Sequence, residues 1–95
     1  MSKFDNVGND ADTKILFSNP AKFGEYDVLY QKWKFDGITG ESLIFANEDL
    51  ENVNIDELKN EIEQSPLVNN SSREITTSKN NGFIFYSFNF TTDDQ

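Results

Sequence analysis

The sequence predicts a small α+β domain, in which an antiparallel sheet of about four strands carries one α-helix on one face. Two hairpin turn signals, Asp36-Gly37 and Asn81-Gly82, each lie between segments of strand composition. Between these hairpins, residues 54–65 have the capping and periodicity of one short helix. The predicted order along the chain is therefore β-β-α-β-β, and 95 residues are the length of one domain.

The two ends of the chain are expected to lie outside this domain. Residues 1–12 are polar and show little periodicity, which predicts a flexible N-terminal arm. Residues 93–95 are expected to form an acidic tail, which leaves 13–92 as the single domain. At its start, 14–17 is a possible short strand, whereas an Asn-Pro pair and a glycine favour a loop over 18–24.

The first hairpin is predicted from residues 25–35 and 38–46. Apolar side chains change face within 25–35, which indicates either a bulge or a strand that is covered on both sides. Gly40 suggests a bulge or a longer loop in the return strand. Trp33 is the only tryptophan, and we expect it to be partly buried opposite the return strand near Leu43.

The helix is predicted from its cap and from its apolar stripe. Asn54 is a favoured N-cap residue, and Glu57 three positions later completes a variant of the capping box. The stripe, at spacings of three and four, consists of Ile55, Leu58 and Ile62. The helix should end near Ser65, because Pro66 disfavours helical geometry in the residue before it.

The second hairpin is predicted from residues 73–78 and from the aromatic segment 83–90. The even positions of this last segment are uniformly apolar, so they are assigned to the core beneath the helix: Ile84, Tyr86, Phe88 and Phe90. The odd positions begin apolar and end polar. Phe83 and Phe85 therefore remain as a candidate aromatic patch on the surface.

No catalytic motif is present in the sequence. The chain has no cysteine and no histidine, which removes thiolate ligands and the commonest acid–base residue. No phosphate-binding glycine loop or nucleophile elbow occurs, and the acidic clusters do not match a calcium-binding loop. We therefore expect a protein that is not an enzyme and that holds neither a cofactor nor a metal ion.

The N-terminal sequence gives an expectation for location, and the overall charge gives one for partners. No apolar leader segment is visible at the N-terminus, so the expected location is the cytoplasm. A formal net charge of −9 argues against direct contact with nucleic acid or with an anionic membrane. The abundance of Asn, Lys, Ile and Phe fits an AT-rich genome, such as that of a low-GC bacterium or its phages.

The acidic residues are concentrated in one part of the chain. Residues 36–63 contain nine acids, with Lys59 as the only base, whereas 14–34 carries a small positive excess. The nine acids are Asp36, Glu41, Glu48, Asp49, Glu51, Asp56, Glu57, Glu61 and Glu63. Solubility explains some of them, and a favourable acidic first helical turn explains Asp56 and Glu57. The remainder suggest a surface that imitates nucleic acid or docks on a basic protein.

These observations lead to two hypotheses for function. The first is a small acidic inhibitor that binds a basic protein surface, on a nuclease or a nucleic-acid-binding complex, in the manner of an anti-restriction, anti-CRISPR or nuclease-immunity protein. The alternative is a non-catalytic subunit or adaptor of a larger assembly that docks through an aromatic sheet edge. Salt separates the two, because acidic docking weakens steeply with ionic strength.

Overall fold

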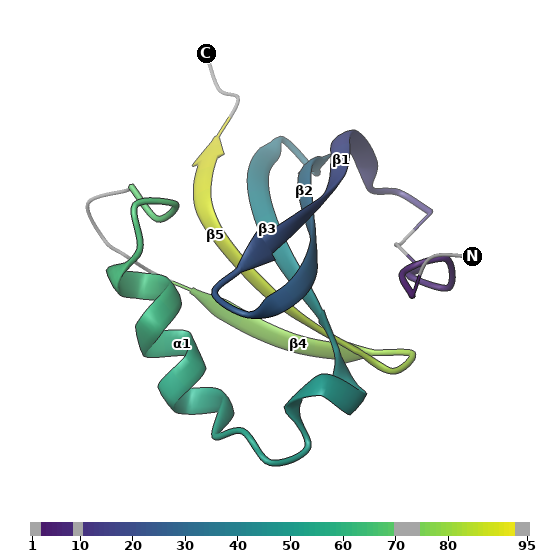
Figure 1. Ribbon diagram of the computed structural model, residues 1–95. Coiled ribbons are helices and arrows are strands. Elements are labelled where there is room, and N and C mark those ends of the chain that lie inside the picture. The colour runs from purple at the N-terminus through teal and green to yellow at the C-terminus, as the bar shows by residue number, and fades with distance from the viewer. Residues whose placement is uncertain (1–2, 9–10, 70–74, 93–95) are drawn as a thin grey trace.

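The computed structural model describes residues 3–8, 11–69 and 75–92, and they form one antiparallel sheet with one α-helix (Figure 1). The strands are β1 (Lys14–Phe23), β2 (Tyr26–Phe35), β3 (Ile38–Ala46), β4 (Thr76–Asn80) and β5 (Phe83–Thr92). The 3-10 helix η1 (Asn47–Leu50) and the helix α1 (Ile55–Gln64) join β3 to β4. The spatial order of the strands is β1-β2-β3-β5-β4. The predicted α+β class and the antiparallel sheet are confirmed.

The sheet has five strands rather than about four, because the segment expected to be a loop belongs to β1. This strand pairs with β2 along its whole length, so the chain order is β-β-β-α-β-β. Pro20 lies within β1, which is an edge strand, where the missing N–H of proline can face solvent. Most of β1 is exposed, including the large apolar side chains of Leu16 and Phe17.

Both predicted hairpin turns are confirmed. Asp36 and Gly37 have φ values of 52° and 77°, and Asn81 and Gly82 have φ values of 54° and 88°. Two consecutive residues with positive φ are what a two-residue type I′ turn requires, and its twist matches that of the flanking strands. The strand β4 covers 76–80 instead of 73–78; residues 73 and 74 lie outside the described part of the chain.

The main core lies between the sheet and α1. Asn54 caps the helix as expected, since its Oδ1 accepts hydrogen bonds from the backbone N–H groups of Asp56 (2.9 Å) and Glu57 (3.2 Å). The stripe then meets alternate residues of the central strands, and the cluster includes Leu58, Ile62, Val28, Leu43, Phe45, Ile84, Tyr86 and Phe88. Ile55 packs against it while partly exposed.

Phe90 does not belong to this core, which corrects the prediction for the last even position. The pairing of β3 with β5 shifts between Thr39 and Glu41, so two residues of β5, Asn89 and Phe90, lie opposite Gly40. Asn89 has a φ of 56°, and its side chain binds the backbone of the loop after α1. This bulge turns Phe90 to the opposite face of the sheet, because the side-chain alternation is reset.

The face of the sheet away from α1 carries Trp33 and a second apolar cluster. Trp33 is half-buried, but its cross-strand partner is Gly40, and Leu43 lies opposite Tyr30. The strand β2 is covered on both faces without a bulge of its own, which was one of the two predicted explanations for its apolar pattern. The second cluster consists of Ile44, Ala46 and Phe83, with Phe4, Val7, Leu29 and Phe85 packed against it.

Candidate functional site

The nine candidate acids do not lie together in the structure. Asp36 is in the turn at one end of β3, and Glu48 follows the other end. The nine residues of β3 separate them by about 30 Å at the usual rise of a strand. Glu41 is also set apart, because it accepts a hydrogen bond from the Tyr30 hydroxyl at 2.7 Å. Burial and this hydrogen bond raise the pKa of Tyr30 to about 12.

The acids of η1 are positioned by one buried residue and one backbone contact. Leu50 is buried in the core, and the N–H of Asn47 donates to the carbonyl oxygen of Gly82 at 2.9 Å. Glu48 therefore projects into solvent. Asp49 is half-buried and forms an ion pair of 2.7 Å with Lys3, whose pKa is raised by that hydrogen bond.

The acids of α1 occupy the side of the helix that faces away from the core. Asp56, Glu57 and Glu61 are exposed, and Glu63 is half-buried. The first two lie in the first turn, where the helix dipole favours negative charge. Glu61 and Glu63 lie near the C-terminal end, where the dipole disfavours it, and the last turn contains no basic residue.

Glu25 joins this group, although the sequence places it in the segment with a positive excess. It lies in the turn between β1 and β2, and this turn and α1 together border a pocket of about 430 Å³. Glu25 and Glu61 line the pocket with the aromatic rings of Phe23 and Tyr26. The spacing of charges along the chain gave no sign of this site, because it depends on how the first hairpin lies against the helix.

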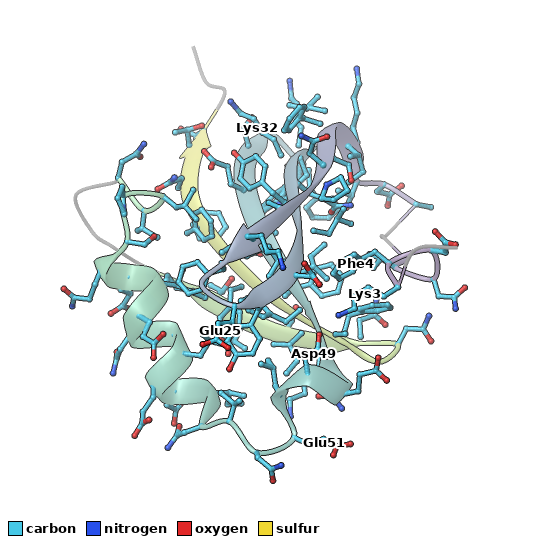
Figure 2. The ribbon with its side chains drawn as sticks, in the orientation of Figure 1. Lys3, Phe4, Glu25, Lys32, Asp49 and Glu51 are labelled. Carbon is cyan, nitrogen blue, oxygen red and sulfur yellow. The ribbon has the colours of Figure 1, made fainter. Side chains whose placement is uncertain are left out.

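We call the exposed acids of this region the acidic rim: Glu25, Glu48, Glu51, Asp56, Glu57 and Glu61. None of the six forms an ion pair within the described residues, whereas Lys22 pairs with Asp27 at 2.8 Å. Figure 2 shows Glu25 and Glu51 toward the end of the molecule where α1 and η1 meet, and Lys32 at the opposite end. Bases also lie in this region, because Lys59 is on α1 and Lys3 pairs with Asp49 of η1.

Neither residue of the predicted aromatic patch, Phe83 or Phe85, is fully exposed in the structure. Phe83 is only 7% exposed, because its ring packs against Phe4 with centroids 6.0 Å apart. Phe85 is half-buried. The strand that carries both, β5, lies between β3 and β4 and is not an edge strand. The backbone at Phe83 and Phe85 is therefore paired on both sides, with β3 and with β4, and has no free edge.

Two further observations concern the described part of the chain only. It contains no group of three or more acidic residues arranged to hold a metal ion. It also contains no helix with the length and apolar character needed to cross a bilayer. Comparison with protein-family models, with curated proteins and with solved structures finds no match to this chain.

Proposed function

We propose that this protein binds a basic surface of another protein through the acidic rim. The observation that carries this proposal is the set of six exposed carboxylates that have no ion-pair partner among the described residues, two of which, Glu25 and Glu61, line the pocket between the β1–β2 turn and α1. A partner with clustered Lys and Arg residues would be attracted by several of these charges at once. Such complementarity chiefly raises the association rate and selects the partner.

Folding alone does not explain these charges. Glu57 and Glu61 are four residues apart on α1, and like charges at this spacing cost a few tenths of a kcal/mol. Glu61 also opposes the helix dipole. A residue that is slightly unfavourable for the fold, exposed and unpaired is explained better by a contact with another molecule.

The pocket beside Glu61 supplies the more specific part of the contact. A guanidinium or ammonium group that enters it would meet the carboxylates of Glu25 and Glu61 and the faces or edges of Phe23 and Tyr26. Aromatic rings attract cations that lie within about 6 Å, and carboxylates bind guanidinium in a bidentate manner. We therefore assign this pocket to an Arg or Lys side chain of the partner.

An inhibitor of nucleic-acid-acting proteins is the function that best fits this surface. Exposed carboxylates without ion-pair partners would present a basic groove with charges like those of a phosphate backbone. The proposed action is competition for that groove, with no reaction catalysed by this chain. The corresponding partner is a nuclease or another nucleic-acid-binding protein in the cytoplasm.

Affinity capture from cell lysate tests the proposal. The immobilised protein should capture a basic partner at low salt and release it at high salt, and duplex DNA should compete for the partner. Glu25→Gln with Glu61→Gln should weaken this capture. Asp36→Asn is the control for each single substitution, because it also removes one negative charge but does so at the opposite end of β3.

The competing role is that of an adaptor within a larger assembly. It would show the opposite pattern, with a partner that resists high salt, ignores duplex DNA and is retained by the Glu25→Gln and Glu61→Gln variants. Equal weakening by Asp36→Asn and by Glu61→Gln would also contradict the proposal, because it would show that only net charge matters.

A further inference from the structure

A row of polar side chains crosses the whole sheet on the face away from α1. The strand register aligns Ser18 with Gln31, Gln31 with Ser42, Ser42 with Ser87, and Ser87 with Thr76. Directly opposed residues point to the same face of an antiparallel pair. Gln31 and Ser42 are 5% and 2% exposed, so the middle of this row is the floor of a depression and not a solvated surface.

The depression is an open pocket of about 200 Å³. Its floor contains Gln31, Ser42 and Ser87, and aromatic walls are provided by Trp33, Phe35 and Phe85. Thr13 and Ser78 add two more hydroxyl groups to the lining. No charged residue lines it among those that the structure describes, although the protein carries a net charge of −9. The chemistry of this site therefore differs from that of the acidic rim.

Trp33 is held in a fixed position at this pocket. Its six-membered ring lies over Gly40, where a side chain of any size would collide with it. Its Nε1–H donates to Ser42 Oγ at 2.8 Å, and the ring of Phe90 packs against it at a centroid distance of 6.0 Å and an angle of 60°. The bulge at Asn89 places Phe90 there. Three separate contacts thus orient one indole ring as a wall.

The two serines on the floor retain unused hydrogen-bonding capacity. Each hydroxyl has one donor and two acceptor lone pairs. One lone pair accepts from Trp33, and the contact of 2.8 Å between Ser42 Oγ and Ser87 Oγ uses one donor and one further lone pair. One O–H donor and two lone pairs remain, so the floor can both donate to and accept from a ligand.

We propose that this pocket binds a neutral, hydroxylated ring, of which a sugar residue is the representative chemistry. The hydroxyl groups of such a ring donate and accept at once, as the floor requires, and its apolar C–H face can stack on Trp33. The volume is below the roughly 300–1,000 Å³ of pockets for drug-sized ligands, so it suits a single ring. An ionised ligand would find no counter-charge among the lining residues.

The single tryptophan makes the test direct, because the indole N–H of Trp33 gives one resolved NMR signal. The probes are methyl glucoside, galactose and N-acetylglucosamine, with a sugar phosphate and p-cresol for comparison. At least one neutral sugar should shift the Trp33 signal in a saturable manner. The sugar phosphate should bind less tightly, since it carries a charge.

Ser87→Ala removes part of the remaining hydrogen-bonding capacity and should weaken sugar binding about three- to tenfold. Ser18→Ala is the matched control, because it makes the same change in the same polar row outside the pocket. Three results would overturn the proposal: no saturable shift with any neutral sugar, equal effects of both variants, or tighter binding of p-cresol than of every sugar. The last result would assign the pocket to an aromatic side chain of a protein partner.

Discussion

Replacing Gly40 by alanine should destabilise the protein, because Trp33 occupies the space of the new methyl group. A Cβ atom on Gly40 would lie 2.5 Å from Cζ2, 2.8 Å from Cη2 and 3.0 Å from Cε2 of Trp33. The indole would have to move, although it is hydrogen-bonded to Ser42 at 2.8 Å and packed against Phe90.

The size of the effect follows from three contributions. Overpacking of this kind costs about 1–3 kcal/mol, and weakening of the Trp33–Ser42 hydrogen bond adds about 0.5–1.5 kcal/mol. Alanine restricts the unfolded chain more than glycine does, which offsets about 0.4–1 kcal/mol. We expect a net loss of roughly 0.5–4 kcal/mol in the free energy of unfolding, which is a substantial share of the stability of a small domain.

A double-mutant cycle with Trp33→Val separates this collision from any other effect of the substitution. Urea unfolding followed by circular dichroism measures all four proteins, since that signal does not depend on tryptophan. In the Trp33→Val background, Gly40→Ala should be neutral or stabilising by up to about 1 kcal/mol. Equal destabilisation in both backgrounds would refute the argument, because the cost would then arise without the indole.

Two further predictions concern the core. Phe88 is fully buried, so Phe88→Ala should lower the free energy of unfolding by about 3–5 kcal/mol in urea titrations, and a loss below about 1 kcal/mol would contradict its placement. Burial raises the pKa of Tyr86 to about 12, and its hydroxyl donates to the Ile55 carbonyl at 3.0 Å. Because the unfolded pKa is about 10, the stability from the neutral phenol is complete below about pH 10 and is lost between about pH 10 and 12. Tyr86→Phe should reduce the loss of unfolding free energy between about pH 10 and 12, and an unchanged loss would show that Tyr86 does not cause it.

The turns and the helix of this protein could be predicted from the sequence because their signals are local. Asp36-Gly37 and Asn81-Gly82 tolerate the positive φ values that a tight hairpin demands, whatever the rest of the chain does. Asn54 satisfies two N–H groups within three residues of itself. The backbone preference and the hydrogen-bond partner lie in the same short segment, so a short window of sequence is sufficient to find them.

The sequence did not fully predict β1 or the C-terminal end of β5, because both depend on contacts between residues far apart in the chain. Residues 18–23 carry an Asn-Pro pair that is typical of a loop, and only their pairing with β2 shows that they continue the strand β1. Phe90 leaves the core because Asn89 binds Leu67 and Asn69 in the loop after α1. The sequence carried two local signals for this bulge, Gly40 on the opposing strand and the tolerance of asparagine for a positive φ, but neither shows that Phe90 changes face. An alternation of period two cannot show where the alternation is interrupted.

The candidate sites also depend partly on composition, which the sequence shows, and partly on packing, which only the tertiary structure shows. The sequence alone determined that the chain carries a large excess of acid, has no histidine or cysteine, and concentrates its acids between Asp36 and Glu63. Only the tertiary structure separated Asp36 from Glu48 along β3, brought Glu25 beside Glu61, and aligned Ser42 with Ser87 beneath Trp33. Composition is a property of each residue, whereas a surface or a pocket depends on strand register and on which strands become neighbours. Long-range packing decides both.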